Sequence, residues 1–239
     1  MVADRHGRFK TQREYPRLAL IETAIVDRCV TLTAPRVGTI QLPHTLPAES
    51  SQEVIVWQSN VRGFDAGDVP ARWISAFLGA ELRMIRFDHA HQRMCNPAYA
   101  GDSGAHTMFA DGYPVLIIGL ASLDDLNVRL AAKGASPLPM NRFRPNIVIA
   151  GLDPYAEDHL DTVESDGVTL RLVKPCVRCQ VTTTDQATGH VGFEPLPTLS
   201  TYRRNDALAG VTFGMNAVVI GGVGRTLALD SAVNAEYRF

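Results

Sequence analysis

The 239-residue sequence has few cysteines and no long apolar run. Its four cysteines show no repeated framework of pairs, which argues against a disulfide-stapled secreted domain and favours free thiols in a reducing compartment. The longest apolar run covers residues 115–121, far below the roughly 20 residues that cross a bilayer, and the first ten residues contain no apolar signal core. We therefore expect a cytoplasmic protein without a membrane segment.

The sequence also lacks a large net charge, internal repeats and low-complexity segments. Its formal net charge is -2 and its pI is about 6.4. Proteins that bind nucleic acids usually concentrate basic residues on one face, so a nucleic acid is not an expected partner. The length allows one large or two small domains.

Apolar and β-branched patterns predict more strands than helices. Residues 11–21, 29–33 and 37–42 are expected to form an antiparallel meander, and residues 181–184 to continue a strand after the second cysteine of a Cys-x-x-Cys pair. Two helices are expected. Asp68, as N-cap, begins the first and Gly79 ends it, while Ser122 and Asp125 have the spacing of a capping box for the second. The expected architecture is a β-rich, barrel-like α+β fold.

The Cys-x-x-Cys pair, Cys176 and Cys179, lies in the segment KPCVRCQVTTTDQATG, residues 174–189. A thioredoxin-like motif needs a helix after the first cysteine, and the strand-forming residues that follow here argue against it. A structural zinc site needs a second pair or spaced histidines, and only His190 lies nearby. Two interpretations stay open: one thiolate that binds a soft metal completed by a cofactor, or two inert cysteines. Arg178 would favour a thiolate and could hold an anion.

Several segments together resemble the MOSC domain, in the branch that contains the mitochondrial amidoxime-reducing components and their bacterial YcbX-type relatives. They are, in order, RFRPNIVIAG (142–151), YAED (155–158), CVRCQVTTTDQATG (176–189), PLPTLSTYR (195–203) and TFGMN (212–216). TQREYPRLALI (11–21), residues 65–79 and FADGYP (109–114) resemble the β-barrel domain that precedes MOSC. The resemblance implies a MOSC-type β-barrel over residues 106–239, a partial N-terminal β-barrel-like domain over residues 1–105, and a few short helices.

The resemblance also implies a molybdenum-molybdopterin enzyme that reduces small N-hydroxylated compounds, namely amidoximes, hydroxylamines and N-hydroxylated bases. In that family the second cysteine ligates molybdenum, so Cys179 is the expected metal ligand and Cys176 its neighbour. Arg144 and Asn146 match positions that hold the pterin and its phosphate, and Asp111 matches an acidic residue close to the metal that can assist proton transfer. Two more residues, Arg178 and Asn216, are expected to contact the cofactor, although animal relatives carry an aromatic residue in place of Asn216.

The sequence departs from the family at both ends. Family members begin with strands that carry a Tyr-Pro-x-Lys-Ser motif and an arginine, and this sequence starts just downstream of them, so we expect a partial N-terminal domain. It has no cysteine-rich extension after residue 239, which implies that electrons come from a separate ferredoxin- or flavin-type protein. The alternative function is a non-catalytic MOSC module that carries sulfur or molybdenum cofactor, and a third possibility is a decayed fragment that binds nothing.

Overall fold

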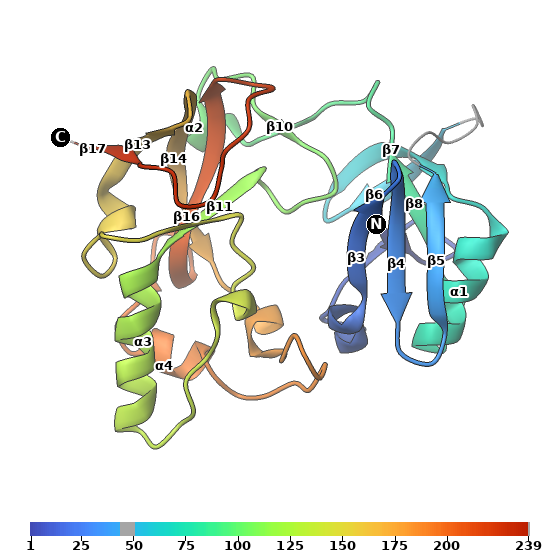
Figure 1. Cartoon of the computed structure of the whole chain (residues 1–239), viewed down its shortest axis with the longest axis horizontal. Helices are drawn as coiled ribbons and strands as arrows, with labels where there is room; N and C mark the ends of the chain where they lie inside the picture. Colours follow the sequence, from blue (N-terminus) through green and yellow to red (C-terminus); the bar gives the residue numbers. More distant parts are fainter. Residues whose placement is uncertain (44–50, 239) are drawn as a thin grey trace. The chain divides into compact units, whose positions relative to one another are not determined.

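The structure, a computed structural model, describes residues 1–43 and 51–238 and divides them between two compact units (Figure 1). Unit 1 consists of Met1–Arg93 and Thr184–Gly192, and unit 2 of Met94–Thr183 and Phe193–Phe239. A short piece of the later sequence thus belongs to the first unit. The domain boundary expected between residues 105 and 106 stays a prediction.

Unit 1 is built from two sheets and one long helix. One sheet has the strand order β2-β1-β8-β7-β6, and the other has the order β3-β4-β5. The strands are β1 (Val2–Ala3), β2 (Phe9–Lys10), β3 (Glu22–Val26), β4 (Cys29–Ala34), β5 (Gly38–Pro43), β6 (Gln52–Val56), β7 (Ser59–Asp65) and β8 (Arg83–Phe87). The expected meander is present as β3-β4-β5, but residues 11–21 are not its first strand. They include the 3-10 helix η1 (Pro16–Leu20), whose first turn suits Pro16 because proline lacks a backbone N–H.

The helix α1 (Asp68–Leu78) buries Trp73, Ile74 and Phe77 in the core of unit 1. It ends, as expected, at Gly79, which has the left-handed φ of 72°. Its N-cap is Gly67 and not the predicted Asp68.

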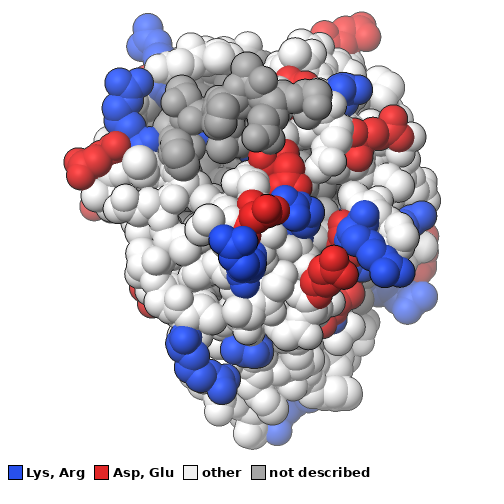
Figure 2. Space-filling view, turned by 90° about the vertical axis from the view of Figure 1, so that its right-hand side faces the viewer, with Lys and Arg blue, Asp and Glu red and all other residues white. Residues whose placement is uncertain are grey.

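On the face of the molecule drawn in Figure 2, basic and acidic side chains are interspersed, without a large region of one sign.

Unit 2 is organised around a sheet with the strand order β12-β11-β16-β14-β13-β17, and β15 pairs with β16. Strands β11 and β12 run parallel, whereas β11–β16, β16–β14 and β14–β13 are antiparallel pairs. The elements are β9 (Arg93–Met94), α2 (Pro97–Ala100), β10 (His106–Thr107), β11 (Val115–Gly119), α3 (Leu120–Ala132), η2 (Met140–Arg142), β12 (Ile147–Ile149), η3 (Ala156–His159), β13 (Leu160–Ser165), β14 (Val168–Val177), η4 (Gln180–Thr183), α4 (Leu196–Ser200), β15 (Arg204–Asn205), β16 (Gly210–Gly221) and β17 (Asn234–Tyr237).

The sheet of unit 2 packs against two separate apolar clusters. Ile117 packs with Met215 and Leu172 in one cluster, and the next residue along β11, Ile118, packs with Phe213 and the buried leucines of α3 in the other. The chain is therefore a β-rich α+β protein, as predicted. Within residues 1–43 and 51–238, no helix has both the length and the apolar character needed to span a membrane.

Two predictions of local structure in unit 2 are wrong. Residues 181–184 do not continue a strand, because η4 occupies Gln180–Thr183. The hydroxyl of Thr182 donates to the Cys179 carbonyl at 2.9 Å, and that of Thr183 donates to the Gln180 carbonyl at 2.8 Å. Such local bonds compete with sheet pairing and favour the helical turn. Ser122 does not cap α3 either, since the helix begins at Leu120.

Candidate functional site

The two motif cysteines lie at the end of a central strand of unit 2. Cys176 is near the end of β14, and Cys179 is half-buried between β14 and η4. The backbone N–H of Arg178 donates to the Val211 carbonyl at 2.7 Å, so the chain between the cysteines is held beside β16. The predicted metal ligand thus lies on a short segment that is fixed at both ends by hydrogen-bonded structure.

The guanidinium of Arg178 is turned toward Cys176. Its Nη1 donates to the Cys176 sulfur at 2.9 Å, and its Nη2 donates to the Phe143 carbonyl at 2.7 Å. Its Nε is buried and has no hydrogen-bond partner among the described residues. A buried donor without a partner is rare in native proteins, which favours a polar group that this site would bind.

Cys176 is suited to remain a thiol. Burial raises its pKa, and the nearby charges of Asp111 and Cys179 act in the same direction, while Arg178 opposes them without reversing the shift. Because a thiolate is the form that binds metal, this environment agrees with a neighbouring role for Cys176. Asp111, from the loop before β11, is thus one of the charges that act on the pKa of Cys176.

The loop between η2 and β12, residues 143–146, lies next to the cysteine segment. Phe143 is fully buried and accepts the bond from Arg178, and its ring lies 4.4 Å from the ring of Phe213. The following residue, Arg144, is exposed and has a left-handed φ of 54°. Arg144 thus directly follows a residue that is bonded to the cysteine segment, and its side chain is accessible.

The two predicted asparagines both lie beside β11: Asn146 directly before β12, and Asn216 on β16. The Asn146 side chain accepts from the Leu116 backbone N–H at 2.9 Å, and Leu116 pairs with Asn216 across β11 and β16. Asn216 in turn pairs with Lys174 of β14, and its Nδ2 donates to the Lys174 carbonyl at 3.3 Å. The carbonyl oxygen of the Asn146 amide is thus used by the sheet, and its Nδ2 is the group that a ligand can use.

Lys174 and Tyr99 were not predicted as site residues, although the register places Lys174 beside Asn216. The Lys174 ammonium lies over the Tyr99 ring, 4.4 Å from its centre. The one sequence signal was the position of Lys174 two residues before Cys176. Tyr99 carried no signal, because its place above the sheet depends on the fold of the loop that contains α2.

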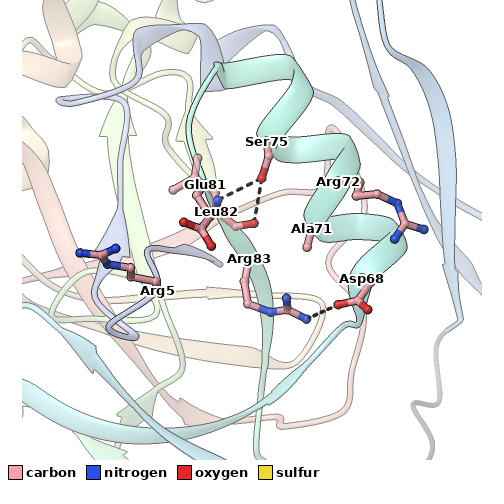
Figure 3. A pocket seen from close by; sticks show the side chains of 8 residues that line it. All are labelled: Arg5, Asp68, Ala71, Arg72, Ser75, Glu81, Leu82 and Arg83. Atoms are coloured by element: carbon pink, nitrogen blue, oxygen red, sulfur yellow. Dashed lines mark hydrogen bonds and ion pairs between the residues drawn. The ribbon is translucent and has the colours of Figure 1, made fainter.

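Unit 1 has a small pocket of about 240 Å³ that contains none of the predicted site residues (Figure 3). Arg83 donates to Asp68 at 3.0 Å, and the Ser75 hydroxyl bonds both the N–H and the carbonyl of Leu82. Arg5 and Arg72 lie at opposite sides of this pocket in the view of Figure 3. Its polar groups hold α1 to β8, which is a structural role.

The class of this protein is indicated by its β-rich fold and by the Cys-x-x-Cys pair at the end of a sheet strand. Among the described residues, no three His, Cys, Asp or Glu side chains gather as a metal site, so a metal bound at Cys179 needs other ligands. The MOSC domain model matches residues 104–228 and the MOSC N-terminal beta barrel domain model matches residues 1–81. The chain belongs to the MOSC domain family.

The chain is similar to proteins named mitochondrial amidoxime-reducing components. It is 36% identical to component 1 of Homo sapiens, over 86% of this chain and 61% of the relative, and 33% identical to component 2 of Bos taurus, over 86% of this chain and 62% of the relative. The chain therefore spans about three fifths of the length of these relatives. A solution structure from Bordetella bronchiseptica aligns over 41% of this chain and 78% of its own at 22% identity, with a TM-score of 0.36.

Proposed function

We propose that this chain is a molybdenum-cofactor-dependent reductase of small N-hydroxylated compounds, such as amidoximes, hydroxylamines and N-hydroxylated bases. The observation that supports the proposal is the hydrogen bond from Arg178, the neighbour of Cys179, to the Phe143 carbonyl, which joins the cysteine segment to the loop 143–146 in a MOSC family member. The names of its relatives support the substrate class. Its electrons would come from a separate ferredoxin- or flavin-type protein, and its cytoplasmic location remains part of the proposal.

The residues present fit a molybdenum-pterin group. Cys179 supplies the soft sulfur ligand that this metal favours, and the buried Nε of Arg178 offers a donor that nothing in the described protein uses. Arg144 presents an accessible guanidinium suited to a phosphate, and the Nδ2 of Asn146 can donate to a pterin edge. Asn216 on β16 lies between Leu116 and Lys174 in the sheet and is a further amide that can contact the cofactor.

The proposed reaction consumes two electrons and two protons, converts the N–OH group to N–H and releases the oxygen as water. The bound cofactor supplies the electron pair. In this proposal Asp111, an exposed acid whose charge acts on the pKa of Cys176, delivers a proton to the leaving oxygen. Arg178 holds the cysteine segment against the Phe143 carbonyl, which fixes the direction of the Cys179 ligand.

The test compares Cys179→Ala with Cys176→Ala, a matched control three residues away. Both variants and the wild type are expressed where the cofactor is made, and the molybdenum content and the reduction of benzamidoxime by an artificial electron donor are measured. We expect about one molybdenum per chain in the wild type and in Cys176→Ala, in accord with a single thiolate ligand, and loss of metal and activity in Cys179→Ala. Full metal content in Cys179→Ala would refute the ligand assignment. Cofactor bound by the wild type without turnover would favour a carrier module.

A further inference from the structure

Lys174 occupies an unusual position among the lysines of this chain. The sequence has three lysines, Lys10, Lys133 and Lys174. Lys10 pairs with Asp4 at 3.2 Å, and Lys133 pairs with Glu194 at 3.0 Å. Among the described residues, the structure gives the Lys174 ammonium an aromatic partner, the Tyr99 ring, and no carboxylate. Its positive charge is therefore held in place without being neutralised.

The register of the sheet places this charge at the candidate site. Lys174 pairs with Asn216, and residues directly opposite each other in antiparallel strands carry their side chains on the same face. Cys176 follows two residues later on the same strand. Lys174 thus contributes a cation to the face of Asn216, on the strand that carries the first motif cysteine.

The Tyr99 ring gives the Lys174 ammonium a cation–π partner. It belongs to the short helix α2, which begins at Pro97 and is capped by the Asn96 side chain, whose Oδ1 accepts from the Ala98 N–H at 3.0 Å. An ammonium over an aromatic face keeps its remaining N–H donors free for a second ligand. Lysine suits a single anionic oxygen in such a place, because its ammonium is a compact charge with three donors.

We propose that Lys174 is a specificity-determining residue that binds an anionic group, a carboxylate or a phosphate, on the N-hydroxylated substrate. The inference rests on the proposed reductase function and deepens it. It makes acidic N-hydroxylated compounds, such as N-hydroxylated amino acids or nucleotides, the preferred substrates over neutral ones. The same chemistry would suit a phosphate of the cofactor, so the experiment has to separate these two sources.

The experiment uses the full chain with its cofactor and two substrates that differ in one charge, benzamidoxime and 4-carboxybenzamidoxime. Lys174→Met removes the charge at similar side-chain length, and Lys174→Arg keeps it. We expect Lys174→Met to lower kcat/KM for the carboxylate substrate about tenfold or more, mainly through KM, as the loss of a charge-assisted hydrogen bond implies. The value for benzamidoxime stays within about twofold of the wild type, and Lys174→Arg recovers part of the loss.

Two further measurements make each outcome decisive. Calorimetry gives the Kd of 4-carboxybenzamidoxime without turnover, and we expect the same weakening in Lys174→Met. If the wild type reduces neither substrate, the proposed function fails while the calorimetric difference still supports Lys174. An equal loss for both substrates shows a purely structural role, and a lowered molybdenum and pterin content in Lys174→Met shows that the lysine serves the cofactor. Either result overturns the assignment to substrate.

Discussion

At the scale of single residues, Glu157 is a carboxylate that the structure buries fully. It accepts from the Gly119 N–H at 3.1 Å and from the Ser122 hydroxyl at 2.7 Å, at the point where α3 begins. A carboxylate in this place satisfies backbone donors that the first turn leaves open and is favoured by the helix dipole. The distant Glu157 therefore does the work that the sequence had suggested for Ser122 and Asp125.

We expect Glu157→Ala to lower the free energy of unfolding by about 3–5 kcal/mol, because two hydrogen bonds to a charged group are lost and their donors stay buried. Glu157→Gln keeps one carbonyl acceptor at similar volume and should cost about half as much. Urea unfolding of the two variants and the wild type measures the difference. Equal stability of all three would show that Glu157 does not cap α3.

Asp125, an acid on α3, makes the stability of unit 2 depend on pH. Its Oδ2 accepts from the Arg129 Nε at 2.7 Å and from the Tyr155 hydroxyl at 2.6 Å. Burial acts to raise the pKa of Asp125, but these hydrogen bonds outweigh it, and the pKa is lowered below its usual value. The unfolded chain therefore binds this proton more readily than the folded protein.

The sign of the pH effect follows directly. A lowered pKa contributes stability that is complete above the unfolded value, near pH 4, and is lost as the pH falls through the folded value. We expect the difference in unfolding free energy between wild type and Asp125→Asn to be constant from about pH 7 to 5 and to shrink below about pH 4. Asp124→Asn, at the exposed neighbouring position, is the control and should show no such trend. A difference that does not change with pH would contradict the role of Asp125.

At the scale of elements, the sequence predicted strands and helices where their signals are local. The apolar face of α3, with Leu126 and Leu130 fully buried, and the left-handed Gly79 after α1 were both foreseeable. Two signals misled. β-branched residues after Cys179 indicated a strand, but the threonine hydroxyls bond to backbone carbonyls three residues earlier and hold a helical turn. Ser122 looked like a cap because its spacing to Asp125 is local, whereas its actual partner, Glu157, lies 35 residues away in the sequence.

The candidate site shows the same limit. Its segments were found by sequence, and the structure joins the cysteine segment to the loop 143–146 through the bond from Arg178 to the Phe143 carbonyl. Neither the turn of Arg178 toward Cys176 nor the use of the Asn146 carbonyl oxygen by Leu116 could be foreseen. Both depend on which strands become neighbours, and that information is spread over the whole fold. The roles of the site residues in catalysis and in cofactor binding remain predictions.

Strand β16 has no room for an added methyl group at Gly214. This residue has a φ of 76°, and a Cβ built on it would lie 2.6 Å from Ile118 Cγ1 and 2.8 Å from the Ile117 carbonyl oxygen. Gly214→Ala adds backbone strain to a clash with the neighbouring strand, so we expect it to cost about 2–5 kcal/mol. Thermal and urea unfolding measure the loss.

Gly134→Ala is the matched control for this prediction. Gly134 has nearly the same φ, 73°, but a Cβ there would meet nothing within 4 Å. Its substitution should cost only the strain of the left-handed conformation, about 1–2 kcal/mol. Similar losses in the two variants would show that β16 and β11 move apart to accept the methyl group.

At the scale of the whole molecule, the chain returns to its first unit late in the sequence. Residues Thr184–Gly192 belong to unit 1 although they follow the cysteine segment of unit 2. A Cβ on Gly189 would lie 3.5 Å from the Arg17 Cα, so this returning segment packs closely on η1. Unit 1 is therefore completed only when most of the chain has been made, and contacts between its two parts link the ends of a long loop.

The most direct of these contacts is an amide pair between Gln12 and Gln186, 174 residues apart. Each side chain donates to the other at 3.1 Å, so removing either side chain breaks both of these bonds. We expect Gln12→Ala and Gln186→Ala each to lower the free energy of unfolding by about 1 kcal/mol. The double variant should lose clearly less than the sum, with a coupling of about 0.5–1 kcal/mol. Urea unfolding of the four proteins completes the cycle. Strict additivity would mean that the returning segment is held by the packing around Gly189 alone.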